Sequence, residues 1–189
     1  DSPDNDPKRR KAVNRWKEIT PPQRGADAFG AFEYLVQQNF VKKDKISLMG
    51  FSWGATAGLM SIDPRIKKLF SPTKGGFHSL IAVYPNSKYW TEMGRMWRRI
   101  ADVNITIPTL MLAGEKDELE SIDVYKELQQ LAEKNTFPLT VVLYPDSYRK
   151  FDEKREKHSV TVNNITLTKA YNKKAHEDSI KQVLSFLSN

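Results

Sequence analysis

Residues 45–61 read KISLMGFSWGATAGLMS, and they contain the most informative local pattern in the sequence. The first five, Lys45 to Met49, form a strand-like run, and Ala55 to Ser61 read as the start of a helix. Between these two segments lies GFSWG at residues 50–54, a G-x-S-x-G pattern. At the end of a buried strand, such a turn leads the chain directly into a helix that packs on the sheet. The stretch therefore predicts a strand–turn–helix unit of a parallel α/β sheet.

Strand-like and helix-like segments alternate along the rest of the chain. Helices are predicted where apolar residues recur at three- and four-residue spacing, and strands where short runs are apolar along their whole length. The predicted helices are 24–39, 89–100, 121–135 and 175–187, and the further predicted strands are 80–84, 109–113 and 139–144. The stretch 149–168 is charged and has no clear period, which predicts a loop or a lid near a site. The sequence thus predicts a doubly wound, mostly parallel α/β sheet in a single domain, residues 1–189.

Composition limits the kinds of chemistry that the chain can perform. The 189 residues are 39% hydrophobic, which is enough for one substantial core. Cysteine is absent, and this excludes disulfides, thiolate metal ligands and a cysteine nucleophile. The apolar runs are too short to span a bilayer, so we expect a soluble protein without a membrane partner, in a compartment, cytoplasmic or periplasmic, that the sequence does not define. No pattern calls for a metal or an organic cofactor.

The positive charge raises the question of a nucleic-acid partner. The net charge is +7 and the isoelectric point is near 9.5. The basic residues are scattered and interleaved with Asp and Glu rather than with stacking aromatic residues, which favours a solvated basic surface. A preference for small anionic substrates fits this charge, whereas binding to nucleic acid is the weaker alternative and would show as steep salt dependence.

The turn at residues 50–54 predicts a serine nucleophile. In this context the chain is held in a strained conformation that exposes the Oγ of Ser52, and we expect a Cβ at either flanking glycine to collide with neighbouring backbone. The N–H of Trp53 would then stabilise an oxyanion at the start of the helix. The alternative is a glycine-rich turn in which Ser52 merely caps the helix.

An acidic partner is predicted after the strand at 109–113. In hydrolases with such a turn, the acid follows the nucleophile at the end of a later strand and the histidine comes last. Asp117 lies in the loop at what should be the same edge of the sheet as Ser52. Three other carboxylates, Glu115, Glu118 and Glu120, compete for this assignment, and a solvated acidic loop is the alternative interpretation.

The position of the base departs from the pattern. The loop after the strand at 139–144 should contain a histidine, but it contains Arg149, which is always protonated and cannot accept a proton from a serine hydroxyl. The chain has three histidines, and His78 and His176 are expected to be ordinary surface or packing residues. His158 is the possible substitute base, because its segment could fold back over the site.

Taken in order, several short segments resemble the dienelactone hydrolase family. The likeness runs through nearly the whole chain, and the matching segments are 1–2, 24–28, 34–35, 46–54, 82–86, 108–117, 144–148, 151–152 and 171–172. The resemblance implies an α/β-hydrolase fold with Ser52 at the position of the nucleophile, Asp117 at that of the acid and Arg149 at that of the histidine. The family also has further N-terminal strands and a loop that donates a second oxyanion N–H. Since this chain begins after them, we expect an incomplete sheet and half of an oxyanion hole.

The leading hypothesis is hydrolysis of a small carboxylic ester or lactone through an acyl-Ser52 intermediate. Ser52 would attack, Trp53 N–H would stabilise the oxyanion, and Asp117 would orient a base. The alternative is a catalytically degenerate member of the family that serves as a binding or scaffold protein. Arg149, with Lys150 beside it, would then suit an anionic ligand. The oligomeric state and the identity of the substrate do not follow from the sequence.

Overall fold

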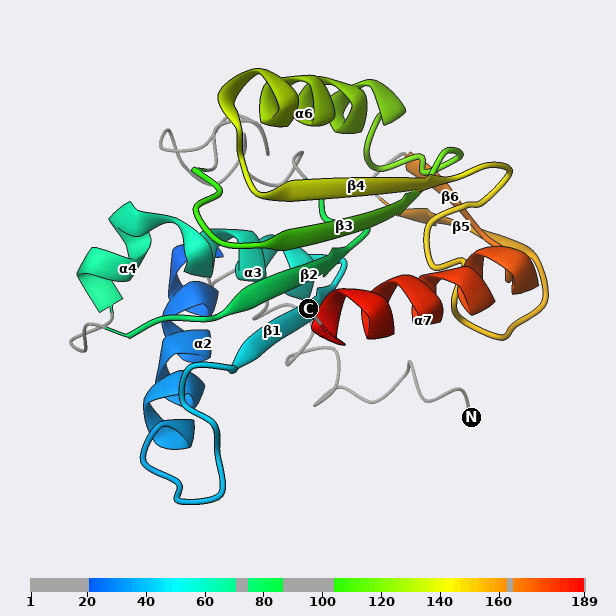
Figure 1. The fold of residues 1–189 in the computed structure, drawn as a ribbon. Helices are drawn as coiled ribbons and strands as arrows, with labels where there is room; N and C mark the ends of the chain where they lie inside the picture. Colours follow the sequence, from blue (N-terminus) through cyan, green and yellow to red (C-terminus); the bar gives the residue numbers. More distant parts are fainter. Residues whose placement is uncertain (1–20, 71–74, 87–103, 163–164, 189) are drawn as a thin grey trace.

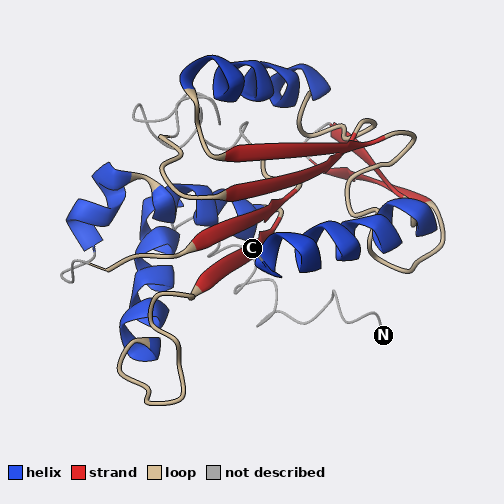
Figure 2. Cartoon of the chain, viewed as in Figure 1, coloured by secondary structure: helices blue, strands red, loops and turns tan. Residues whose placement is uncertain are grey.

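A computed structural model describes residues 21–70, 75–86, 104–162 and 165–188 (Figure 1). Strands and helices are interspersed along the chain, and a hairpin precedes the last helix (Figure 2). They are α2 (Pro21–Leu35), β1 (Ser47–Phe51), α3 (Trp53–Ile62), α4 (Pro64–Phe70), β2 (Ser79–Val83), β3 (Thr109–Gly114), α6 (Ile122–Asn135), β4 (Leu139–Tyr144), β5 (His158–Val162), β6 (Ile165–Lys169) and α7 (Lys173–Ser188).

The main sheet is parallel throughout. Its four strands lie in the order β1-β2-β3-β4, each paired with the next one in sequence. In the register, Leu48 lies beside Leu80 and Leu110 beside Thr140. Because all four strands run the same way, the loops that follow them emerge at one edge of the sheet. This edge is where the candidate site forms.

Apolar residues cover both faces of the sheet. Leu80 and Ala82 of β2 point into a core with α2, α3 and α6, while Ile81 and Val83 point to the other face. On that second face Val183 of α7 packs against the sheet, and Figure 1 shows α7 as the one described helix that lies across it. The central strands β2 and β3 are buried along their whole length, and this is why the sequence shows them as short continuous apolar runs rather than as an alternation.

The predicted elements agree closely with the observed ones. The strand predicted at 139–144 has the same bounds as β4, and the helix predicted at 121–135 begins one residue later, with Ser121 as its N-cap. The predicted helix at 89–100 lies outside the described residues. The doubly wound parallel arrangement is confirmed for the part of the chain that the structure describes. None of the described helices is both long and apolar enough to cross a bilayer.

The prediction of an irregular segment at 149–168 was wrong in its second half. Residues His158–Val162 and Ile165–Lys169 form an antiparallel hairpin, in which Val160 pairs with Leu167 and Thr161 with Thr166. One face of the hairpin is lined with hydroxyl groups and the other with aliphatic side chains. The alternation of Ser and Thr with Val, Ile and Leu is a strand signal of period two, but two five-residue strands among many charges are too short to stand out.

Candidate active site

Ser52 occupies the turn between β1 and α3. Its φ is 52° and its ψ is −116°, a combination that non-glycine residues rarely adopt. The turn is held by a backbone hydrogen bond from Ser52 N–H to Val83 C=O at 2.9 Å and by one from Thr56 N–H to Ser52 C=O at 3.0 Å. The Ser52 side chain makes no capping hydrogen bond to the helix, so the interpretation as a helix cap is not supported. Its hydroxyl is available for other partners.

The two glycines that flank this turn have different roles. A Cβ on Gly50 would lie 2.4 Å from the backbone carbon and oxygen of Gly54, which no small adjustment could relieve. A Cβ on Gly54 would meet nothing within 4 Å. The expectation that both glycines are required was therefore wrong for Gly54. Gly50 alone permits the close crossing of β1 and α3.

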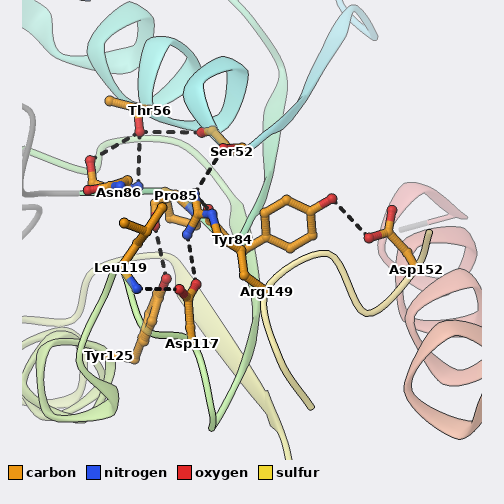
Figure 3. A network of polar contacts seen from close by, with 10 residues as sticks. All are labelled: Ser52, Thr56, Tyr84, Pro85, Asn86, Asp117, Leu119, Tyr125, Arg149 and Asp152. Atoms are coloured by element: carbon orange, nitrogen blue, oxygen red, sulfur yellow. Dashed lines mark hydrogen bonds and ion pairs between the residues drawn. The ribbon is translucent and has the colours of Figure 1, made fainter. Parts of the chain in front are cut away.

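One buried guanidinium joins Ser52 to Asp117. The Nη2 of Arg149 donates to Ser52 Oγ at 3.0 Å, and its Nη1 donates to Asp117 Oδ2 at 2.7 Å. The Arg149 and Asp117 side chains are 4% and 0% exposed, so this ion pair is withdrawn from water. Figure 3 shows Arg149 between the other two side chains, in the place where a base would have to lie to reach both.

Arg149 also makes a third contact, to a residue that sequence reasoning did not identify. Its Nη2 donates to the backbone oxygen of Tyr84 at 2.6 Å, and the guanidinium carbon lies 5.3 Å from the centre of the Tyr84 ring. Tyr84 follows β2 directly and has a positive φ of 39°. A backbone carbonyl leaves no mark on residue identity, and the sequence placed Tyr84 at the end of the predicted strand 80–84 rather than in the loop that follows. Arg149 thus links the loops after all four parallel strands.

A second layer of hydrogen bonds fixes these loops (Figure 3). Tyr84 Oη donates to Asp152 Oδ1 at 2.9 Å, and Tyr125 Oη donates to the Pro85 carbonyl at 3.0 Å. Burial, together with the Asp152 carboxylate, raises the pKa of Tyr84 far above its ordinary value, so its hydroxyl remains a donor. Asn86 N–H donates to Thr56 Oγ1 at 3.0 Å. These hydrogen bonds fix residues 84–86, which directly follow β2.

In the acidic loop after β3, Asp117 pairs with Arg149. Its other oxygen accepts the N–H of Leu119 at 2.9 Å. Burial raises the pKa of Asp117, while the charge of Arg149 and the hydrogen bond from Leu119 oppose that rise. Glu118 instead accepts the N–H of Thr168 at 3.1 Å and so connects this loop to the hairpin.

The histidines lie elsewhere. His158 begins β5, is exposed, and has its Nδ1 2.9 Å from the carbonyl oxygen of Glu156. Within the described residues it has no contact with Ser52 or Asp117. His176 lies in α7 with its Nδ1 3.2 Å from Tyr171 Oη, and the backbone N–H of His78 donates to Ile46. The structure therefore does not bring a histidine to the serine, and His158 as a substitute base stays a prediction without support from its position.

Two further expectations concern the oxyanion and charge. Trp53 is the first residue of α3, so its N–H belongs to the first turn, whose N–H groups have no carbonyl partner within the helix.

Lys150 pairs with Glu153 at 2.6 Å. Since Arg149 is paired with Asp117, both cations on which the anionic-ligand hypothesis rested have acidic partners. In the described ranges no group of three or more potential ligands is placed to hold a metal ion.

Known proteins resemble this chain in sequence and in fold. The sequence matches the Dienelactone hydrolase family over residues 1–189. It is 33% identical over 113 residues to the "Uncharacterized peptidase YtmA" of Bacillus subtilis (strain 168), a match that covers 51% of this chain and 44% of that protein.

Similar folds occur in solved esterase structures. The butyrate-bound esterase Est2 of Thermogutta terrifontis has a TM-score of 0.67 and 13% identity, with 90% of this chain and 66% of that chain covered. The carboxylesterase Cest-2923 of Lactobacillus plantarum WCFS1 has a TM-score of 0.65 and 14% identity, with 87% and 66% covered. At such identities the likeness concerns the fold. The chain spans no more than about two thirds of the length of these relatives.

Proposed function

Because the chain belongs to the dienelactone hydrolase family, we propose that Ser52 stands in the nucleophile position of a site for carboxylic esters or lactones. One observation carries this proposal. A single side chain, that of Arg149, contacts both Ser52 Oγ and Asp117 Oδ2, at 3.0 and 2.7 Å. The spacing of the two side chains therefore suits a base between them, which would accept the proton of Ser52 and be oriented by Asp117.

With a base in that place, the reaction is an ordinary acyl transfer. Ser52 Oγ forms a bond to the carbonyl carbon while its proton passes to the base, and the Trp53 N–H stabilises the oxyanion. The ester bond breaks, and the leaving alkoxide takes the proton. Water then attacks the acyl-serine with the same base, releasing the carboxylic acid and regenerating the Ser52 hydroxyl. Asp117 stabilises the protonated base in both halves.

Arg149 cannot perform the first proton transfer. Its guanidinium stays protonated at any ordinary pH and offers donors but no acceptor. Loss of one member of such a triad commonly lowers the rate by a factor of about 1,000 to 10,000, and binding and oxyanion stabilisation remain. In this chain the Ser52 site therefore binds an ester or lactone and hydrolyses it only at a residual rate.

A binding role is the second candidate, and the hydrogen bond from Arg149 to Ser52 favours it. That bond occupies a lone pair of the oxygen that would have to attack, and it thereby lowers the nucleophilicity of Ser52. An anionic ligand is the less supported version of this candidate, because the charges of Arg149 and Lys150 are paired with Asp117 and Glu153. A neutral ligand is compatible with a site whose central ion pair is balanced.

The test is the substitution Arg149→His, assayed with 4-nitrophenyl acetate. We expect the rate of hydrolysis to rise at least about 100-fold, which is part of what a missing base costs. Adding Ser52→Ala in this background should abolish the gain, and adding His158→Ala should leave it unchanged. Arg149→Gly assayed with added imidazole provides a second route, because the free base can occupy the vacated space if a histidine ring is misplaced.

Two results would contradict the proposal. If folded Arg149→His and imidazole-supplemented Arg149→Gly both stay at the rate of the unmodified chain, Ser52 does not belong to a hydrolytic site. If the unmodified chain already turns over ester at an ordinary enzymic rate and His158→Ala removes that activity, the base is His158 and not position 149. Labelling by an organophosphonate separates these cases, because rapid stoichiometric labelling of Ser52 requires a working base.

A further inference from the structure

The hydrogen-bonding roles at Ser52 are fixed by the chemistry of its neighbour. An arginine side chain has five N–H donors and no acceptor, so in the contact between Arg149 Nη2 and Ser52 Oγ the serine oxygen is the acceptor. The hydroxyl proton of Ser52 therefore points elsewhere. Within the described part of the chain, the Ser52 hydroxyl donates no hydrogen bond to a protein group.

The position of Arg149 allows little rearrangement of these roles. Its Nη2 also donates to Tyr84 C=O and its Nη1 to Asp117, so the guanidinium is held from three directions while only 4% exposed. Rotation of the guanidinium would break the ion pair with Asp117 in a buried setting, which is costly. Ser52 itself is only partly buried, so its proton can reach a ligand or water.

We infer that Arg149 converts Ser52 from a nucleophile into a hydrogen-bond donor, and that the site holds an uncharged ester or lactone by its carbonyl oxygen and hydrolyses it no faster than the residual rate. This inference rests on the proposed function, since it concerns the same Ser52 site. The ligand is neutral because the ion pair behind Ser52 is balanced: Arg149 is paired with Asp117 and Lys150 with Glu153, so a carboxylate placed beside Ser52 would gain no free charge from either cation to offset its loss of hydration. The ligand must also be an acceptor, because the proton of Ser52 needs one.

Three compounds with the same carbon framework test this inference on the unmodified protein. Dihydrocoumarin is an aromatic lactone, chroman is the same ring system without the carbonyl oxygen, and 3-(2-hydroxyphenyl)propionate is the ring-opened acid. Dissociation constants measured by titration calorimetry or ligand-observed NMR should favour dihydrocoumarin over chroman by about tenfold, the value of one good hydrogen bond. Dihydrocoumarin should also bind more tightly than the acid.

Variants connect the preference to the serine proton. Ser52→Ala should bring the affinity for dihydrocoumarin down to that for chroman, while Ser159→Ala, which removes an exposed hydroxyl from the hairpin, should change neither. The infrared carbonyl stretch of bound dihydrocoumarin should shift to lower frequency in the unmodified protein and return in Ser52→Ala. A role of Ser52 confined to folding would not move that band.

Three outcomes would overturn the inference: equal affinity for dihydrocoumarin and chroman, tighter binding of the acid, or no binding of any of the three at millimolar concentration. The same variants distinguish failure of the donor role from failure of the hydrolytic site. A gain in hydrolysis by Arg149→His, without Ser52-dependent binding in the unmodified chain, would leave the hydrolytic site in place and refute the donor role. Ser52-dependent binding without any gain would do the reverse.

Discussion

The chain between β4 and α7 consists of two parts with opposite properties. Residues 145–152 are tightly integrated: Arg149 and Phe151 are buried, and Ser147 C=O accepts the N–H of Lys116. The hairpin of β5 and β6 has no buried residue among those whose burial is described, and a hydrogen bond from Thr168 N–H to Glu118 connects it to the rest of the described protein. Both parts follow the strand after which a catalytic base was expected, yet only the first reaches the serine.

This difference shows how strongly the structure specifies position 149. Three hydrogen bonds from the Arg149 guanidinium end on three different loops, and a fourth loop carries the residue itself. His158 has a hydrogen bond to a carbonyl two residues away and nothing that would direct it to the site. A base supplied by the hairpin would require the hairpin to move as a unit. A base at position 149 would require one substitution.

The largest expected effect is on stability, and it separates the two parts. Arg149→Met should lower the free energy of unfolding by about 3–5 kcal/mol, because it leaves the Asp117 carboxylate buried without its cation. His158→Ala should lower it by less than about 0.5 kcal/mol, since the residue is exposed. Urea denaturation of both variants measures the difference. Similar losses in the two variants would mean that the structure does not hold position 149 as described.

The pH dependence of this loss gives a further check. Burial raises the pKa of Asp117 and Arg149 opposes the rise, so the pKa in folded Arg149→Met lies even higher. A carboxyl whose pKa is higher in the folded than in the unfolded state favours folding at low pH, and the benefit disappears as the pH rises through the folded pKa. The loss caused by Arg149→Met should therefore be smaller near pH 4 than near pH 8. An unchanged loss would place its cause outside the Asp117 charge.

The next effect tests how closely residues 145–152 approach β3. A Cβ on Gly114 would lie 2.2 Å from the carbonyl oxygen of Ser147, so Gly114→Ala must displace backbone. We expect a loss of about 3 kcal/mol, the upper part of the usual range for overpacking. Gly54→Ala is the matched control, because a Cβ there meets nothing and alanine favours the helix by up to about 1 kcal/mol. Equal effects in urea denaturation would contradict the close approach.

Sequence reasoning succeeded where the pattern depends on residue type and order. The strand and the helix around Ser52 follow from apolar runs. The turn between them follows from Gly50, which is required because β1 and α3 cross closely there. Asp117 could be placed at the correct edge of the sheet, because parallel strands send their loops to one side. The choice of Asp117 over Glu118 needed the structure, since both are acids one residue apart and only contacts distinguish them.

The features that the sequence could not predict depend on backbone groups, on side-chain pairing or on very short strands. Tyr84 contributes its carbonyl oxygen to Arg149, and no residue type announces a backbone acceptor. The pairing of Arg149 with Asp117 also changes an inference, because from sequence alone the arginine looked like an unpaired cation suited to an anionic ligand. The hairpin was missed because each strand has five residues and lies among charges that obscure the alternation.

The smallest expected effect concerns the attachment of the hairpin. Glu118 Oε1 accepts the N–H of Thr168 at 3.1 Å, and a two-stranded hairpin has little stability of its own in water. Glu118→Ala removes this acceptor, whereas Glu118→Gln keeps an oxygen at the same place and removes only the charge. Hydrogen exchange of backbone amides in β5 and β6 should therefore accelerate about 2- to 10-fold in Glu118→Ala, the equivalent of one hydrogen bond.

The comparison with Glu118→Gln decides what that acceleration means. If the hydrogen bond holds the hairpin, exchange in Glu118→Gln should stay close to that of the unmodified protein, while exchange in β3 and β4 stays the same in both variants. Equal acceleration in the two would show that the charge of Glu118, and not its acceptor oxygen, is responsible. No change in either would mean that other contacts hold the hairpin. Its aliphatic face, with Val160 beside Leu167, would then be the next place to substitute, because that face is the less exposed of the two.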